Sequence, residues 1–458
     1  MARHRSLLAL AAVALLAAGA AACSGTLVDG QADPADIAPS CSAVQVICGG
    51  ACFDEDPTHC GNGCADCTGR ALPAGAEAVC EAHACTFACA PGTLRSGDSC
   101  QAAIAVAAGW AHTCAITADG AVHCWGDNRR GQLGDGTTDQ RDAPVDVALP
   151  GPATALAAGY VHTCAAVAGE AWCWGDNSTG ALGDGTTTGR TAPVKVPGLA
   201  GVTALAAGGG ENAGQVSTYY GHTCALAGGL VRCWGGNESG QLGDGSFTQR
   251  LAPVAPSGLG SGATAIATGD RHTCAVVAGQ AWCWGADGSS QLGDGNTQNR
   301  NTPQRPIGSG AAQVAGGAVH SCAVADGALL CWGGNDSGQS AGGDPTPGVV
   351  RTPAAVDLAG VAPAQVATGG AHSCAAGGGA LRCFGGNGSG QLGVPATARG
   401  AVTVDLPAVQ AVTAGYAHTC ALLASGGVMC WGDGAWGQLG RGGDGGGDTS
   451  APGYVSGR

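Results

Sequence analysis

Seven histidines recur along the chain, each followed by a threonine or serine and then a cysteine. A histidine beside a hydroxyl side chain can activate a nucleophile, but such catalysis also requires an acid that orients the histidine. No acidic residue recurs with these histidines. We therefore expect the histidines to be structural, each hydrogen-bonded within its own repeat, and we do not expect an enzyme. The seven are His112, His162, His222, His272, His320, His372 and His418.

Cysteines are the second reactive residue type, and the chain has twenty-five of them. In an exported chain such residues form disulfides. Fourteen fall into seven pairs, and folding the chain about each intervening turn as a tight hairpin sets the two cysteines opposite each other. Opposed residues of antiparallel strands have Cα atoms about 4.5–5.5 Å apart, which is within disulfide range. The predicted pairs are Cys114 with Cys124, Cys164 with Cys173, Cys224 with Cys233, Cys274 with Cys283, Cys322 with Cys331, Cys374 with Cys383, and Cys420 with Cys430. The alternative is seven pairs of reduced, buried cysteines.

Metal binding is the remaining chemistry that cysteine, histidine and aspartate side chains could perform here. Cys60, Cys64 and Cys67 with His59 would suit zinc, but export favours cystines over metal-bound thiolates. Loops that read Gly-Asp-Gly or Gly-Asp-Asn could attract calcium, yet they lack the carboxylate density of a strong site. We therefore expect neither a metal nor a cofactor.

The first residues are typical of an export signal. Residues 1–22 have a basic start, a short apolar stretch and a small-residue cleavage site, so we interpret them as a signal peptide. Cys23 follows at once and resembles the lipid-attachment cysteine of bacterial lipoproteins, although Ala20 stands where that pattern favours leucine. We expect an outer-membrane lipoprotein or an extracellular protein. The alternative is ordinary cleavage that leaves Cys23 free or disulfide-bonded.

Composition and length suggest the domain organisation. The 458 residues are 45% hydrophobic and 11% charged, with a formal net charge of −14. This acidic balance disfavours nucleic acid and anionic membranes as partners, so membrane contact is expected only through a lipid anchor. Residues 23–40 have the composition of a tether, and residues 41–100 carry ten cysteines, which predicts a small module held by five disulfides. Residues 101–458 contain the repeats.

The repeats share one pattern: a strand-like run ending in Ala-Gly, then His-Thr/Ser-Cys-Ala, Cys-Trp-Gly, and a loop with Gly-Gln-Leu-Gly. The histidines are separated by 46 to 60 residues, a period typical of propellers and solenoids. WCWGDNSTGALGDG, at residues 172–185, closely resembles the regulator of chromosome condensation repeat. The resemblance implies a closed propeller with four strands per blade. We thus expect an all-β chain, a seven-bladed β-propeller preceded by a small disulfide-rich module.

Apolar residues of the repeats are expected to form the core. The leucines Leu133, Leu182, Leu242, Leu292, Leu392 and Leu439 should pack between blades, and the tryptophans Trp125, Trp174, Trp234, Trp284, Trp332 and Trp431 beside the hairpins. The sixth repeat has Phe384 instead of tryptophan, and the fifth reads Gly338-Gln339-Ser340-Ala341, so we expect an irregular fifth blade.

Binding residues are sought where the repeats differ. The position two residues before each histidine holds Trp110, Tyr160, Tyr220, Asp270, Ala318, Gly370 and Tyr416. Its aromatic members come from consecutive blades of a closed ring, and the loop after Cys-Trp-Gly emerges on the same face. Exposed aromatic residues and arginines are typical of protein-binding hot spots. We therefore expect a binding arc, with little contribution from Asp270 and Ala318; the alternative is that these aromatic residues only shield blade edges. The predicted binding residues are Trp110, Tyr160, Tyr219, Tyr220, Tyr416, Trp436, Arg129 and Arg130.

These features favour a non-catalytic, monomeric propeller that binds an unknown protein or surface ligand. The resemblance extends to a secreted propeller that inhibits β-lactamases, so a secreted enzyme inhibitor is the alternative. Guanine nucleotide exchange on a small GTPase, the activity of the eukaryotic namesake, is disfavoured by export. A lyase is disfavoured because no paired acids occupy corresponding loops.

Overall fold

The computed structural model describes residues 45–48, 51–54, 72–74, 76–81, 84–210, 219–342, 348–395, 400–442 and 447–457. The chain divides into two units, Met1–Leu72 with Ala76–Ala88, and Pro73–Gly75 with Cys89–Arg458. Before the second unit, β1 (Gln45–Cys48) pairs with β2 (Ala51–Asp54), and β3 (Ala76–Glu81) pairs with β4 (Ala84–Cys89). The predicted signal peptide, the tether, Cys23 and the alternative zinc ligands all lie outside the described residues.

The second unit includes residues 89–100, which the composition assigns to the cysteine-rich module. Cys89 and Cys100 lie at disulfide distance, across the hairpin of β5 (Leu94–Ser96) and β6 (Ser99–Gln101). Cys89 also forms an antiparallel bridge with Gly457 near the end of the chain. The final cysteine pair of the predicted module therefore packs as part of the propeller.

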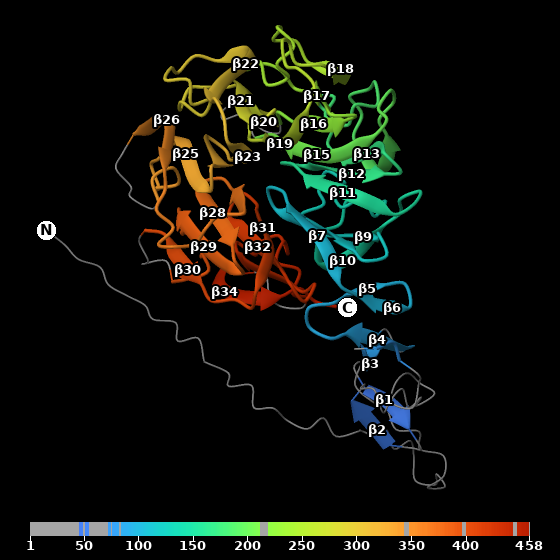
Figure 1. Cartoon of the computed structure of the whole chain (residues 1–458). Helices are drawn as coiled ribbons and strands as arrows, with labels where there is room; N and C mark the ends of the chain where they lie inside the picture. Colours follow the sequence, from blue (N-terminus) through green and yellow to red (C-terminus); the bar gives the residue numbers. More distant parts are fainter. Residues whose placement is uncertain are drawn as a thin grey trace, which may run out of the picture. The chain divides into compact units, whose positions relative to one another are not determined.

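Seven four-stranded antiparallel sheets form a ring in the second unit, as the number of repeats predicts (Figure 1). Blade one is β7 (Ala103–Ala108), β8 (His112–Thr117), β9 (Val122–Gly126) and β10 (Arg141–Val147); blade two is β11 (Ala153–Ala158), β12 (His162–Val167), β13 (Glu170–Gly175) and β14 (Arg190–Lys195); blade three is β15 (Val202–Gly208), β16 (His222–Ala227), β17 (Leu230–Gly235) and β18 (Arg250–Val254). Blade four is β19 (Ala263–Thr268), β20 (His272–Val277), β21 (Gln280–Gly285) and β22 (Arg300–Ile307); blade five is β23 (Ala311–Gly316), β24 (His320–Ala325), β25 (Ala328–Gly334) and β26 (Val349–Ala355). Blade six is β27 (Gln365–Thr368), β28 (His372–Gly377), β29 (Ala380–Gly385) and β30 (Val402–Val404); blade seven is β31 (Val409–Ala414), β32 (His418–Leu423), β33 (Val428–Gly432) and β34 (Thr449–Tyr454).

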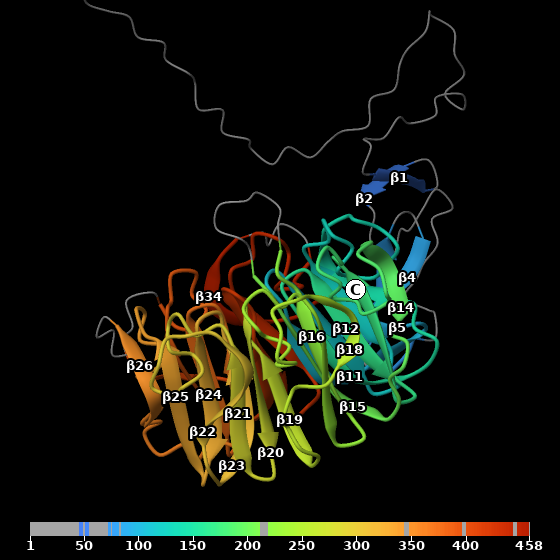
Figure 2. The same ribbon diagram turned by 90° about the horizontal axis from the view of Figure 1, so that it is seen from above.

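Ring closure occurs between blades seven and one. In every blade the strands follow sequence order, and the first strands contact one another in succession, ending with β31 against β7. Figure 2 shows the ring from the side, with the strands running from one face to the other. Across the closing contact, Trp125 Nε1 donates to the main-chain oxygen of Gln438 at 2.9 Å. Each blade thus consists of consecutive strands, and closure depends on packing and hydrogen bonds between blades.

The hairpin between the second and third strands has the predicted register. In blade five, Cys322 lies opposite Cys331, and the turn residues Asp326 and Gly327 have φ angles of 49° and 77°. Positive φ at both positions is the requirement of a two-residue type I′ turn, which glycine meets without steric cost. The structure places the Sγ atoms of all seven predicted pairs at disulfide distance.

The apolar core lies between the blades as seven clusters. In one of them, Leu133 and Cys114 of blade one pack against Trp174 of blade two. The same arrangement recurs around the ring, for example Leu182 with Trp234. The leucines therefore pack between blades as predicted. The tryptophans do not simply flank their own hairpins, because each one packs against the preceding blade.

Blade five keeps its turn despite the loss of leucine. The backbone N–H of Ser340 donates to Asn335 Oδ1 at 3.0 Å, as the N–H of Leu133 does to Asn128 Oδ1 in blade one. The buried Ser340 hydroxyl donates to the main-chain oxygen of Gly334 at 2.8 Å. The expected irregularity is therefore absent from this loop up to residue 342.

Candidate functional site

The seven recurrent histidines form a ring of hydrogen bonds between blades. His112 Nε2 lies 2.9 Å from the hydroxyl oxygen of Thr163 in blade two, and His418 Nε2 lies 2.9 Å from that of Thr113, which completes the ring. The other five make equivalent contacts at 2.9 or 3.0 Å. The expectation that each histidine bonds within its own blade is therefore wrong, because its ring reaches the next blade.

The hydrogen bonds indicate which ring nitrogen of each imidazole carries the proton. The Thr163 hydroxyl donates to the main-chain oxygen of Gln132 at 2.8 Å, so it accepts from His112 Nε2. Burial away from water disfavours the charged form and lowers the pKa of His112 to about 4. The pKa values of the other six fall to about 3 or 4 for the same reason. These imidazoles are therefore neutral donors that join blades.

A glycine stands at the end of the first strand of each blade for a steric reason. A Cβ atom on Gly159 would lie 2.6 Å from Cε1 of His162, closer than real Cβ atoms approach. Similar clashes would occur at Gly109 and Gly415. The inner strands therefore end in residues without side chains, which leaves the residue after each glycine to line the centre of the ring.

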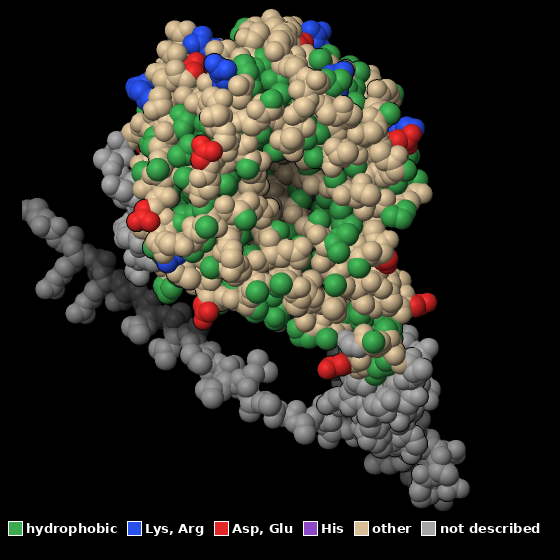
Figure 3. Space-filling model, viewed as in Figure 1, with side chains coloured by type: hydrophobic (Ala, Val, Ile, Leu, Met, Phe, Trp, Pro, Cys, Tyr) green, Lys and Arg blue, Asp and Glu red, His purple; other side chains and the backbone are tan. Residues whose placement is uncertain are grey.

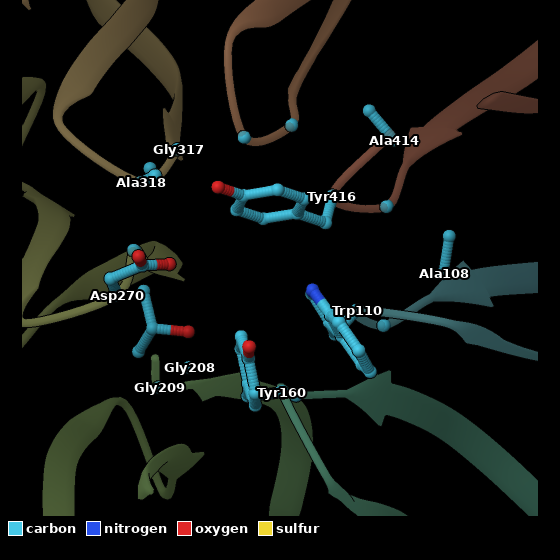
Figure 4. Close-up of a pocket in the computed structure, with 18 of the residues that line it drawn as sticks. Ala108, Trp110, Tyr160, Gly208, Gly209, Asp270, Gly317, Ala318, Ala414 and Tyr416 are labelled. Carbon is cyan, nitrogen blue, oxygen red and sulfur yellow. The ribbon is translucent and has the colours of Figure 1, made fainter. Parts of the chain in front are cut away.

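A pocket of about 120 Å³ lies at the ends of the first strands. Its larger side chains are Trp110, Tyr160, Asp270 and Tyr416, which come from blades one, two, four and seven. Figure 4 shows Trp110 and Asp270 on opposite sides, with Tyr160 and Tyr416 between them. Four residues far apart in the sequence therefore meet at the centre of one face.

Aromatic rings and guanidinium groups extend from this pocket across the same face. The rings of Trp110 and Tyr160 stack with centroids 5.0 Å apart, and Tyr160 contacts Tyr219 at 5.7 Å. The Arg129 guanidinium lies 3.9 Å from the Trp436 ring centroid and 5.9 Å from that of Trp110. We call these residues, together with Arg130, whose guanidinium lies 5.0 Å from the Tyr219 ring, the aromatic–arginine arc: Trp436, Arg129, Trp110, Tyr160, Tyr219 and Arg130.

Tyr220 lies elsewhere than the repeat alignment predicts. Gly209 lines the pocket at the position of blade three, and the extra residues of this blade separate it from Tyr220. The Tyr220 ring is buried under the Arg271 guanidinium at 3.8 Å. Counting back from the histidine therefore misplaced this residue, because the insertion falls between the two positions. Tyr416 does line the pocket, and 48% of it is exposed.

Asp270 lines the pocket, although the sequence analysis expected it to contribute little to binding. Burial raises its pKa to about 7, although the neighbouring Arg271 charge opposes this shift. Among the described residues, none makes a hydrogen bond or ion pair with its carboxylate. The signal in the sequence was a charged residue at a position that otherwise holds aromatic or small residues.

The aspartates of the Gly-Asp-Gly loops are engaged in ion pairs. In blade one, Arg141 lies 2.9 Å from Asp135, and the Asn128 amide donates to the same carboxylate. Hydrogen bonds to its ionised form lower the pKa of Asp135. The recurrent arginine six residues after each aspartate was the sequence signal for these pairs. The equivalent pairs are Asp184 with Arg190, Asp244 with Arg250, and Asp294 with Arg300.

Charges are sparse on the face drawn in Figure 3. Acidic and basic side chains lie scattered toward the edge of the ring, and the centre is hollowed. On this face, among the described residues, lysine and arginine do not gather into a patch of the kind that binds phosphate backbones.

Comparisons with known proteins agree with this architecture. Residues 58–407 match the RCC1-like domain, and residues 409–438 match the Regulator of chromosome condensation (RCC1) repeat. A chain in the crystal structure of Kap60 bound to yeast RCC1 (Prp20) is similar with a TM-score of 0.63 and 23% identity, over 73% of this chain and 83% of that one. The crystal structure of human WBSCR16 is similar with a TM-score of 0.63 and 22% identity, over 73% of this chain and 94% of that one. At such identities the similarity supports a shared fold only.

A short segment also resembles a much larger protein. It is 47% identical over 64 residues to the E3 ubiquitin-protein ligase HERC2 of Homo sapiens, which is 14% of this chain and 1% of that protein. The chain thus spans about one hundredth of the length of this relative.

Proposed function

We propose, from the premise that this chain belongs to the family of RCC1-like propellers, that it is an exported, non-catalytic protein whose aromatic–arginine arc binds a protein partner. The observation that carries this proposal is the continuous set of ring and guanidinium contacts from Trp436 to Tyr219. Tryptophan, tyrosine and arginine are the residues enriched at binding hot spots. Tyr160 is buried beneath this arc, so the groups offered to a partner are the rings of Trp110, Tyr219 and Trp436 with the two arginines.

Preorganisation supports this role for the arc. Arg129 donates to both carboxylate oxygens of the buried Asp127, at 2.8 and 3.1 Å. This bidentate contact holds the guanidinium beside the Trp436 ring, so little side-chain freedom remains to be lost on binding. Arg129 is therefore held in place before any partner arrives.

The proposal of binding rather than catalysis is supported by how the recurrent polar groups are used. The neutral imidazoles donate to hydroxyls of the next blade, and the Gly-Asp-Gly aspartates pair with arginines. These groups stabilise the scaffold in every blade where they occur. The side chains to which we assign the function are those of the arc and of the central pocket.

Export and anchoring form part of the proposal, on the basis of residues 1–22 and Cys23. Metabolic labelling with a fatty-acid analogue should mark the protein, and Cys23→Ala should abolish the label because the acceptor thiol is lost. Labelled Cys23→Ala protein would contradict attachment at this residue. Exported protein without label would instead indicate a soluble secreted form.

Partner capture tests the arc. Full-length protein should retain its partner from surface extracts, and Trp110→Ala or Arg129→Ala should weaken binding at least about tenfold, which is roughly 1.4 kcal/mol. Asp336→Ala is the matched control, because Asp336 occupies in blade five the loop position that Arg129 occupies in blade one. Binding would be measured by calorimetry on the captured partner.

The outcome distinguishes the alternatives. Normal binding by both arc variants, with unchanged melting temperature, would show that these rings serve packing alone. A hydrolase among the captured proteins would assign the propeller as its inhibitor. Equal weakening by Asp336→Ala would place the interface outside the arc.

A further inference from the structure

The central pocket combines the Asp270 carboxylate with three aromatic rings. Figure 4 shows Tyr416 extending across the pocket toward the side that carries Asp270, with Trp110 on the opposite side. Asp270 remains partly accessible from the pocket while it lacks a hydrogen-bond or ion-pair partner among the described residues. A carboxylate so placed is stabilised by a ligand that carries positive charge.

A second polar group in the pocket also lacks a partner. Thr368 lines the pocket at the end of β27, and its buried hydroxyl makes no hydrogen bond to any described residue. Buried polar groups normally have a partner, so this hydroxyl is an unsatisfied group in the wall of the pocket. Its oxygen is covered by neighbouring atoms, so the partly accessible Asp270 carboxylate is the acceptor that a ligand would meet.

The size of the pocket limits what can enter it. A volume of about 120 Å³ exceeds what one water requires but falls below the roughly 300–1,000 Å³ of pockets for drug-sized ligands. The ligand is therefore a small molecule or the end of a side chain.

We propose that this pocket binds a primary alkylammonium group. Asp270 neutralises its charge and accepts its hydrogen bonds, because an ammonium ion has three donors and no acceptor. The alkyl chain lies against the rings of Trp110 and Tyr416, whose electron-rich faces attract cations. Burial raises the pKa of Asp270 to about 7 despite the neighbouring Arg271 charge, and a cation bound in the pocket would lower it again.

This inference rests on the proposed function in one respect, since Trp110 and Tyr160 belong to both the arc and the pocket. It deepens that function by naming the chemistry at the centre of the interface. The ammonium group comes either from a lysine side chain of the protein partner or from a free amine. Both sources present the same group to Asp270.

The test is a calorimetric titration of the full chain at pH 8 with n-butylammonium chloride, and with 1-butanol as the neutral match. The ammonium should bind at least about tenfold more tightly than the alcohol. Asp270→Asn should abolish that preference, whereas Asp336→Asn, which removes an exposed carboxylate from blade five, should preserve it. Tyr416→Ala should weaken ammonium binding about fivefold, since a cation–π contact of roughly 1 kcal/mol is lost.

Three results would overturn the proposal: equal affinity for the two ligands, no binding of either at millimolar concentration, or an unchanged preference in Asp270→Asn. Melting curves confirm that each variant is folded. Arg129→Ala should leave butylammonium binding intact while it weakens partner capture, so failure of the pocket and failure of the arc are separable.

Acetylation of the lysines in the surface extract distinguishes the two sources. Acetylation removes the ammonium charge of the partner's lysines, whereas the pocket of the propeller is not modified. Loss of capture after acetylation assigns the ammonium to the partner. Retained capture, together with butylammonium binding, assigns the pocket to a free amine.

Discussion

Acidification from pH 7.5 to pH 5.5 is expected to lower the free energy of unfolding of the propeller by several kcal/mol. The seven ring histidines are buried and neutral, with pKa values of about 3 or 4. At pH 5.5, protonation stabilises each unfolded histidine, whose ordinary pKa is about 6.5, by about 1.4 kcal/mol. The folded histidine stays neutral and gains no such stabilisation. The seven together amount to roughly 10 kcal/mol, comparable to the whole stability of a typical domain.

The direction of the effect follows from which state takes up protons. Because the folded pKa lies below the unfolded one, stability is complete above about pH 6.5 and declines as the pH falls toward 4. Asp270 and Asp287 act in the opposite direction, since burial raises both pKa values to about 7. The two offset at most about 4 kcal/mol over this range, so the histidines dominate.

Urea titrations at pH 7.5, 6.5 and 5.5, followed by the fluorescence of the buried tryptophans, measure this dependence. His320→Gln removes one titrating group and should reduce the acid-induced loss by about 1.4 kcal/mol. His123→Gln is the control, because His123 lies outside the ring and contacts Asp146 instead. Equal stability at pH 7.5 and pH 5.5 would contradict the assignment of neutral, buried imidazoles.

Reduction of the seven predicted blade disulfides is expected to have the second large effect. Each closes a loop of about ten residues, and a cross-link of that length stabilises by at most about 2–3 kcal/mol. The seven together could contribute on the order of 15–20 kcal/mol, more than the usual stability of a domain. Protein unfolded and reduced in denaturant should therefore fail to refold until its thiols are oxidised again.

Two measurements examine the disulfides separately from refolding. Mass mapping of unreduced peptides should link Cys114 to Cys124 and Cys164 to Cys173. The double variant Cys164→Ala with Cys173→Ala should lose about 2–3 kcal/mol while the other six links persist. Links between different blades, or free thiols throughout, would contradict the pairing.

Local pairing in this protein could be predicted from the sequence. The period of the histidines indicates how many units there are, and the turn length indicates which residues of a hairpin lie opposite each other. Cys322 and Cys331 illustrate this, since shortening the turn by one residue keeps them in register. Such relations involve neighbouring residues, where hydrogen-bond geometry leaves few alternatives.

Contacts between blades were decided only by the tertiary structure. His112 and Thr163 are 51 residues apart, and no local pattern indicates that the imidazole would reach the next blade rather than its own. The sequence predicted that Leu133 packs between blades, but not that its partner is Trp174 of the next blade, nor where Tyr220 lies after the insertion. Asp270 became a site residue for this reason, because ring closure brings it opposite Trp110. Sequence determines the blades through short-range geometry, whereas the pocket depends on how seven blades pack around a common centre.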